Sequence, residues 1–268
     1  MSDSVPPLGP GTILTSGYGV LRHLHRTENL DVYDVWSDER ACCCVAKVVN
    51  PNRDRAAIGR RHLVREGQLL LELSHPHIVR AYELIEQPEP VLILETLPGA
   101  TIQYLVEGRG RRFPLVGLAY LGLHLGSAMH YLHRRGYLHL DLKPSNVISD
   151  RGLAKVIDFS IARRPGPGRA GVGTRHYMAP EQARGEELTE QTDVWGIGAV
   201  LFEAATGQPL FKAYRGERYE QVERRADSIR QHRRLPATLT AALDACLNPE
   251  PAMRPSADEL LKVLAGLV

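Results

Sequence analysis

Short apolar runs separated by polar residues dominate the first hundred residues and predict a β-rich region. One segment in this region, residues 60–73, instead spaces its apolar side chains as an amphipathic helix does. The runs that predict strands lie at residues 18–21, 31–36, 42–49, 78–84 and 91–94. The pattern therefore predicts five strands and one helix in this part of the chain.

After Leu97-Pro98-Gly99 the pattern becomes mainly helical. The predicted helices lie at residues 116–134, 192–206, 219–234, 238–247 and 257–267. Residues 219–234 are polar and rich in Arg, which predicts a helix on the surface. Two parts are therefore expected, a sheet-rich one at about residues 17–97 and a helical one at about residues 98–268.

Composition narrows the class of protein. The 268 residues are 43% hydrophobic and 24% charged, which suits a globular protein with a sizeable core. A net charge of +2 gives no reason to expect nucleic acid or an anionic membrane as a partner. No apolar run approaches the roughly 20 residues of a membrane-spanning helix. Residues 1–16 carry Pro and Gly and no signal-peptide core, so they predict a flexible tail.

The four cysteines indicate a reducing compartment. Cys42, Cys43 and Cys44 are consecutive and Cys246 stands alone, so no Cys-x-x-Cys spacing or paired framework exists. Reduced thiols are typical of cytosolic proteins, and we expect a cytoplasmic location.

One short stretch gathers groups suited to chemistry. His139-Leu140-Asp141-Leu142-Lys143-Pro144-Ser145-Asn146 places an Asp, a Lys and an Asn in one loop, and Asp158 ends a nearby apolar run. Together these residues supply a candidate base, a cation that attracts phosphate and two oxygen ligands for Mg²⁺. Such a set is typical of phosphoryl transfer from a nucleotide.

These residues resemble motifs of the protein kinase family. The loop resembles the catalytic loop H-R-D-L-x-x-x-N, and Asp158-Phe159-Ser160 resembles the D-F-G element. Further pieces follow in the family's order, namely Val45-Ala46-Lys47, Glu66, Ala179-Pro180-Glu181, Asp193 and Arg254. The resemblance covers the chain from about Tyr18 to its end. It implies an α+β, two-lobed kinase-like fold with a small sheet-rich N-lobe and a mainly helical C-lobe.

The resemblance also implies roles for individual residues. Asp141 would be the catalytic base and Lys143 would neutralise the moving γ-phosphoryl group, while Asn146 and Asp158 would hold Mg²⁺. Lys47 would bind the α- and β-phosphates of ATP and pair with Glu66. The residues expected to contact the rest of the nucleotide are Val32, Val45, Leu94, Glu95, Leu97 and Ile148. Scaffold roles fall to Asp193, which would fix the catalytic loop, and to Glu181 and Arg254, which would anchor the activation segment (residues 158–181).

The function implied is Mg²⁺-dependent transfer of the ATP γ-phosphoryl group to Ser or Thr of a protein substrate. Lys143 and Thr174 together resemble kinases directed at Ser and Thr rather than Tyr. Any regulatory input is expected from a separate partner protein. The alternative is a pseudokinase that binds nucleotide or a partner with weak or no catalysis. A small-molecule kinase is disfavoured by the Ala-Pro-Glu element.

Several positions depart from the family pattern. The three glycine positions of the phosphate-binding loop fall on His25, Thr27 and Leu30, which predicts weaker nucleotide binding or a differently shaped loop. Val45 replaces a small Ala, and Ser160 replaces the glycine of D-F-G.

One further departure concerns regulation. Leu140 replaces the catalytic-loop arginine that binds a phosphorylated activation segment in many kinases. Residues 161–173 contain no Ser, Thr or Tyr. We therefore expect no switch by phosphorylation within that stretch.

Overall fold

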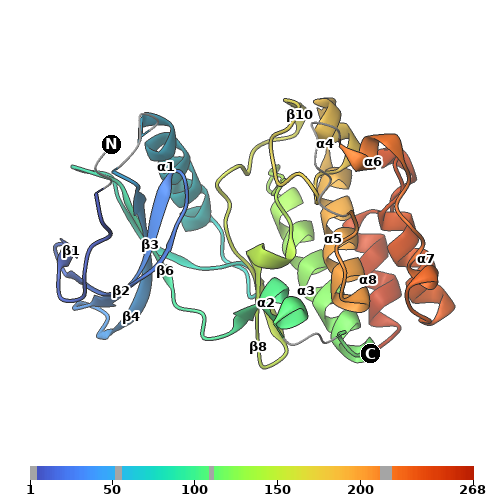
Figure 1. Ribbon diagram of the computed structural model, residues 1–268, viewed down its shortest axis with the longest axis horizontal. Helices are drawn as coiled ribbons and strands as arrows, with labels where there is room; N and C mark the ends of the chain where they lie inside the picture. The colour runs from blue at the N-terminus through green and yellow to red at the C-terminus, as the bar shows by residue number, and fades with distance from the viewer. Residues whose placement is uncertain (1–4, 52–55, 109–111, 212–218) are drawn as a thin grey trace. The chain divides into compact units, whose positions relative to one another are not determined.

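The computed structural model describes residues 5–51, 56–108, 112–211 and 219–268, and Figure 1 shows their course. The chain divides into two compact units. The N-terminal unit contains residues 1–74 and 79–98, and the C-terminal unit contains residues 75–78 and 99–268.

The N-terminal unit is built on a six-stranded antiparallel sheet with the order β1-β2-β3-β4-β6-β5. Its strands are β1 (Ile13–Thr15), β2 (Tyr18–Arg26), β3 (Leu30–Ser37), β4 (Cys42–Val49), β5 (Ala81–Ile85) and β6 (Val91–Glu95). The five predicted strands are confirmed, although their ends differ. Strand β1 is an addition that pairs with β2, so residues 13–15 belong to the sheet rather than to a flexible tail. Its brevity and its Gly and Pro neighbours hide it from a pattern search.

Side chains alternate strictly along β4, which gives the sheet two different faces. Cys44 and Ala46 are buried in the core cluster together with Tyr33 and Val35. Val45 and Lys47, on the other face, are half-buried. Helix α1 (Ala56–Glu72) packs on that second face, where a side chain at Gly67 would come within 2.7 Å of Leu84. The predicted helix at residues 60–73 is confirmed.

The C-terminal unit is mainly helical, which confirms the predicted α+β class. Its helices are α2 (Ile102–Glu107), α3 (Leu115–His133), α4 (Pro180–Arg184), α5 (Glu190–Thr206), α6 (Glu220–Glu223), α7 (Ala237–Cys246) and α8 (Ala257–Ala265). Helix α5 is buried along almost its whole length and contacts α3 and α7, and α3 also packs against α8 (Figure 1). Gly122 lets α3 and α8 approach, because a Cβ there would lie 2.6 Å from Leu264. The core of this unit therefore surrounds α5.

The predicted surface helix at residues 219–234 is wrong. Helix α6 covers only Glu220–Glu223, and a single 3₁₀ turn follows at Ile229–Gln231. Between them, Asp244 of α7 accepts hydrogen bonds from Ser228 Oγ (2.5 Å) and from the Ile229 N–H (3.0 Å). These bonds favour a bend over a continuous helix, because they satisfy backbone and side-chain donors locally.

Short strands position the loops of the C-terminal unit. Strands β7 (Ala100–Thr101), β8 (Val147–Asp150) and β9 (Leu153–Val156) form a three-stranded antiparallel sheet. Strands β10 (Gly166–Pro167) and β11 (Glu187–Leu188) form a separate pair that ties two parts of the chain together.

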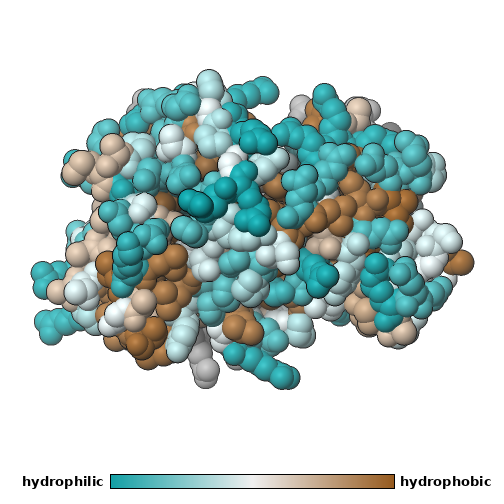
Figure 2. All heavy atoms as spheres, turned by 180° about the vertical axis from the view of Figure 1, so that it is seen from behind, coloured by the Kyte–Doolittle hydropathy of each residue, from teal (hydrophilic) through white to brown (hydrophobic). Residues whose placement is uncertain are grey.

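The surface is mostly hydrophilic on the face shown in Figure 2, with apolar side chains in separate groups. Large apolar side chains that are exposed in the C-terminal unit include Tyr104, Val116 and Leu153. Among the helices that are described, none is both long enough and apolar enough to cross a bilayer.

Candidate active site

One buried carboxylate holds the backbone of the catalytic loop, residues 139–146. Asp193, in the first turn of α5, accepts hydrogen bonds from the N–H groups of His139 and Leu140, both at 2.8 Å. Burial alone would raise the pKa of Asp193. The hydrogen bond with the His133 ring (2.9 Å) and the nearby charges and backbone donors outweigh burial and hold the pKa below its usual range. The predicted scaffold position of Asp193 therefore has a clear structural basis.

Asp141 lies at the centre of a compact polar cluster. One of its carboxylate oxygens accepts hydrogen bonds from the Thr174 N–H (3.0 Å) and the Thr174 hydroxyl (2.7 Å). The Lys143 ammonium lies 2.7 Å from the other oxygen and also donates to the Thr174 hydroxyl at 2.6 Å. A hydroxyl group is thus held between a carboxylate that can accept its proton and an ammonium beside its oxygen. An acceptor hydroxyl in phosphoryl transfer needs the same surroundings.

Asn146 and Asp158 lie at the same end of the β8–β9 hairpin. Val147 pairs with Val156, and the N–H of Ile157 donates to the Asn146 carbonyl at 2.9 Å. The Asn146 side chain uses its Nδ2 to donate to the carbonyl and carboxylate of Asp141, at 3.0 and 3.1 Å. Its amide oxygen is therefore the atom that could bind a cation.

This donor set fits Mg²⁺. The hairpin offers one amide oxygen and one carboxylate, and Mg²⁺ in proteins takes one or two carboxylates and completes its shell with water and substrate phosphates. No group of three or more His, Cys, Asp or Glu that could hold a metal occurs among the described residues. Asn146 and Asp158 could therefore supply two of the oxygen ligands of such an ion.

Lys47 and Glu66 form a close ion pair in the N-terminal unit. The ammonium of Lys47, on β4, donates to a carboxylate oxygen of Glu66, on α1, at 2.7 Å. The Glu66 side chain is fully buried and that of Lys47 is mostly buried. Because an uncompensated buried charge is costly, the sequence must keep both partners together. The pair predicted from the motif is present.

Three of the apolar residues predicted to contact the nucleotide share the Lys47 face of the sheet. Val32 lies directly opposite Lys47 in the β3–β4 pair, and Val45 lies opposite Leu94 in the β4–β6 pair. Residues directly opposite each other in antiparallel strands point to the same side, and so do residues two apart in one strand. These side chains therefore form one apolar surface around the base of the lysine.

The other three residues predicted to contact the nucleotide lie at different places in the fold. Glu95 ends β6, and both its N–H and its carboxylate are hydrogen-bonded to the backbone of Arg80. The Glu95 carboxylate is thus engaged with the backbone of the neighbouring segment. Leu97 is half-buried after β6, and Ile148 is a β8 residue of the C-terminal unit, paired with Lys155.

The turn between β2 and β3 lies where the family pattern has a glycine-rich loop. The Thr27 hydroxyl accepts hydrogen bonds from the N–H groups of Asn29 (3.3 Å) and Leu30 (2.9 Å). The Thr27 N–H donates to the Leu30 carbonyl at 2.8 Å. Asn50 then fastens the turn to the end of β4, donating to the carbonyls of Thr27 and Asn29. Three N–H groups that a glycine-rich loop would offer to phosphate are therefore used within the turn.

Charged side chains hold the base of this turn. Arg26 donates to both carboxylate oxygens of Asp31, at 2.7 and 2.8 Å, and the His23 ring lies 3.0 Å from the same carboxylate. Asp31 is buried. Because a bidentate pair fixes geometry as well as charge, the turn is set without any ligand.

The activation segment is anchored at its end by a buried ion pair. Arg254 donates to both carboxylate oxygens of Glu181, at 2.7 and 2.8 Å, and also to backbone carbonyls, including that of Gln191. Both side chains are almost fully buried. This is the pair that the resemblance implied.

Sequence reasoning missed two buried glutamines that contact this segment. Gln221 of α6 donates to the carbonyls of Arg175 (2.8 Å) and Met178 (3.2 Å). Gln182, the residue after Glu181, contacts the catalytic loop. A polar residue beside a recognised motif was the only signal for Gln182, and Gln221 had none.

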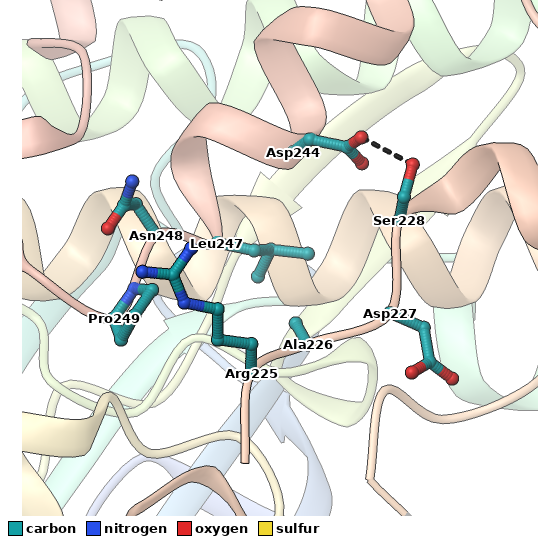
Figure 3. Close-up of a pocket in the computed structure, with 8 residues that line it drawn as sticks. All are labelled: Arg225, Ala226, Asp227, Ser228, Asp244, Leu247, Asn248 and Pro249. Atoms are coloured by element: carbon teal, nitrogen blue, oxygen red, sulfur yellow. Dashed lines mark hydrogen bonds between the residues drawn. The ribbon is translucent and has the colours of Figure 1, made fainter.

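A small cavity lies elsewhere in the C-terminal unit (Figure 3). Its volume is about 130 Å³, and its lining comes from residues 225–228, Asp244 and residues 247–249, with the Ser228–Asp244 hydrogen bond on its wall. None of these residues belongs to the catalytic loop or the activation segment. The cavity therefore contributes nothing to the candidate site.

Several curated proteins with similar sequences are bacterial serine/threonine-protein kinases. The chain is 32% identical over 218 residues to the DNA damage-responsive serine/threonine-protein kinase RqkA of Deinococcus radiodurans, covering 76% of this chain and 32% of that protein. It is 34% identical over 212 residues to serine/threonine-protein kinase PkaA of Streptomyces coelicolor, covering 75% and 38%. It is 32% identical over 227 residues to serine/threonine-protein kinase PknB of Mycobacterium tuberculosis, covering 75% and 36%. The chain thus spans about a third of the length of these relatives.

A family model gives the same result over nearly the whole chain. The model described as the protein kinase domain matches residues 20–264. That range includes the Lys47–Glu66 pair, the catalytic loop and the Glu181–Arg254 pair described above. The chain therefore belongs to the protein kinase domain family.

Proposed function

We propose that this chain is a protein kinase domain that transfers the γ-phosphoryl group of ATP to Ser or Thr of a protein substrate. The observation that carries the proposal is the Thr174 hydroxyl held between Asp141 and Lys143. It supports a site for an aliphatic hydroxyl acceptor. The bacterial Ser/Thr kinases among the relatives support the same acceptor class.

In the proposed reaction the acceptor hydroxyl takes the place next to Asp141 that Thr174 occupies. The hydroxyl oxygen forms a bond to the γ-phosphorus, the bond from that phosphorus to the β–γ bridging oxygen breaks, and ADP leaves. Asp141 accepts the hydroxyl proton, and Lys143 offsets the negative charge on the phosphoryl oxygens. Both side chains are mostly buried, which strengthens their interactions relative to water.

Residues for the nucleotide and the metal follow from the contacts already described. Asn146 and Asp158 would hold Mg²⁺, which when bound neutralises phosphate charge. Lys47, oriented by Glu66, would bind the phosphates, and Val32 and Val45 would contact the base. The contacts predicted for Leu94, Glu95, Leu97 and Ile148 stay predictions.

Two broader expectations accompany this function. The free thiols of Cys42, Cys43, Cys44 and Cys246 support a cytoplasmic location. Regulation by a separate partner protein remains a prediction from the sequence.

Transfer of radiolabelled phosphate from ATP to a general protein substrate tests the proposal. Wild type should label the substrate in the presence of Mg²⁺, and Asp141→Asn should abolish labelling while keeping the thermal unfolding midpoint. Asp258→Asn makes the same chemical change at an exposed residue and should label as wild type does. Nucleotide binding without labelling by wild type would instead establish the pseudokinase alternative.

A further inference from the structure

The Gln182 side chain is a buried donor placed between two backbone carbonyls. It is 3% exposed, and its Nε2 donates to the carbonyls of Leu140 and Val172, both at 2.7 Å. Its Oε1 accepts a longer bond from the Ala179 N–H at 3.4 Å. A primary amide has two hydrogens on one nitrogen, so it is the neutral group that satisfies two carbonyls at once.

The first carbonyl belongs to the peptide group that enters Asp141. The N–H of that peptide group donates to His139 Nδ1 at 3.1 Å, so both of its polar atoms are held. Leu140 itself is left-handed, with a φ of 67°, a conformation that non-glycine residues rarely adopt. Asp193 holds the Leu140 N–H and Gln182 holds its carbonyl. The orientation of Asp141 therefore depends directly on Gln182.

The second carbonyl belongs to Val172, two residues before Thr174. Gln182 thus joins the two chain segments whose residues meet at the Asp141–Thr174 contact. Gly173, between them, has a φ of 127°, and a Cβ there would lie 2.6 Å from Gln182 Nε2. The glycine makes room for the amide.

Two further neutral contacts lie beside Leu140. Leu140 packs with Leu138, Leu188 and Ile161 in an apolar cluster. Two backbone hydrogen bonds join Leu138 to Arg163, at 2.7 and 3.0 Å. Residues 161–173 provide no hydroxyl that could carry a phosphate. Next to Leu140, which replaces the catalytic-loop arginine, the contacts with the activation segment are therefore apolar or between backbone groups.

We propose that the Gln182 carboxamide is a positioning group that holds the activation segment against the catalytic loop in place of a phosphate–arginine contact. This role rests on the proposed kinase function. Gln182 acts through the backbone that precedes Asp141 and Thr174, and it is not expected to touch substrate.

Steady-state kinetics on Gln182→Met tests this role, because methionine keeps the length and removes both donors. We expect kcat with a protein substrate to fall about 10- to 100-fold, with KM for ATP within about twofold of wild type, as one or two buried hydrogen bonds would cost. Gln221→Met is the matched control, since it removes the same two donors from carbonyls that do not adjoin Asp141. Its kcat should fall less than fivefold.

The pH profile of Gln182→Glu separates positioning from simple destabilisation. An ionised carboxylate offers no donor to the two carbonyls, whereas the protonated acid offers one. The activity of this variant relative to wild type should therefore rise as the pH falls from 8 toward 5.5. Thermal unfolding of each variant gives the unfolding midpoint. The kcat of wild type is also measured before and after phosphatase treatment.

The outcomes are distinct. A large kcat loss in the methionine variant at an unchanged unfolding midpoint, together with the rising relative profile of Gln182→Glu and phosphatase-resistant activity, supports the proposal. Equal kcat losses in both methionine variants, a flat relative profile, or wild-type activity lost on phosphatase treatment would overturn it. A wild type without transfer activity would instead refute the proposed function.

Discussion

The backbone of the β2–β3 turn and that of the catalytic loop are held by different hydrogen-bond partners. In the turn, the N–H groups of Thr27, Asn29 and Leu30 bond to atoms of the turn itself. In the catalytic loop, the backbone is held from outside by Asp193 and Gln182, and the side chains of Asp141 and Lys143 remain available to a hydroxyl. The turn has lost the sequence features of the family, whereas the loop has kept nearly all of them.

The difference separates the residues for transfer from the backbone groups that could bind nucleotide phosphates. Phosphoryl transfer needs fixed side chains at the reacting oxygen, and the C-terminal unit provides them. Backbone N–H contacts to phosphate add affinity for nucleotide, and three such N–H groups of the turn are already hydrogen-bonded within it. Weak nucleotide binding combined with an intact transfer site is the expected result.

The largest effect is expected from breaking the buried Glu181–Arg254 ion pair of the C-terminal unit. Arg254→Met should lower the free energy of unfolding of the C-terminal unit by about 3–5 kcal/mol, because it leaves Glu181 buried without a cation. Arg224→Met, which breaks the exposed pair with Glu220, should cost about 0.5 kcal/mol or less. Urea unfolding followed by fluorescence measures both, and equal midpoints would contradict the expectation.

The second largest effect is expected from replacing Lys47 in the N-terminal unit. Lys47→Met should lower kcat/KM by about 10²- to 10³-fold, because a preorganised cation is lost from the phosphates. Lys262→Met removes a lysine that is exposed and paired within α8, and it should stay within twofold of wild type. Retention of more than a tenth of the activity by Lys47→Met would show that the N-terminal unit contributes little beyond packing.

Restoring glycine to the turn should sharpen the comparison further. The double variant His25→Gly/Thr27→Gly removes the hydroxyl that holds two N–H groups and frees the backbone, so Mg-ATP should bind up to about 10-fold more tightly. Calorimetric titration measures the Kd. His25→Ala/Thr27→Ala frees the same N–H groups without the backbone freedom and should change the Kd less. An unchanged Kd in the glycine variant would mean that the turn does not limit affinity.

The smallest expected effect is a pH dependence of stability in the C-terminal unit. His124 Nδ1 accepts a hydrogen bond from the Ala154 N–H (3.3 Å), and its ring stacks 4.0 Å from that of His77. Burial, with a smaller contribution from His77, lowers the pKa of His124 from 6.5 to about 4. The unfolded chain therefore binds the proton more tightly, and this histidine makes stability fall as the pH drops from about 6.5 toward 4.

His124→Asn checks the sign of this effect, since its amide oxygen can accept the same hydrogen bond. The urea midpoint of wild type should decrease more between pH 7 and pH 5 than that of the variant. His25→Gln, at an exposed residue of β2, should follow wild type. Parallel decreases in wild type and His124→Asn would rule out the histidine as the source.

Sequence alone predicted what local pattern and fixed motifs encode. The β4 alternation located Lys47, and the spacing of Asp141, Lys143 and Asn146 in one loop predicted the cluster that the structure contains. Gln182 and Gln221 could not be predicted, because their function depends on which carbonyls tertiary folding brings near them. The helix predicted at residues 219–234 failed for the same reason, since a carboxylate from α7 bends that segment.

The Glu181–Arg254 pair joins residues that are 73 positions apart in the chain. During synthesis on the ribosome, Glu181 emerges well before Arg254, and until then the buried carboxylate has no partner. The activation segment therefore cannot settle until α5, α6 and α7 have been translated. A nascent chain stopped before that point would contain Asp141 and Lys143 but would lack the guanidinium that holds the end of the activation segment.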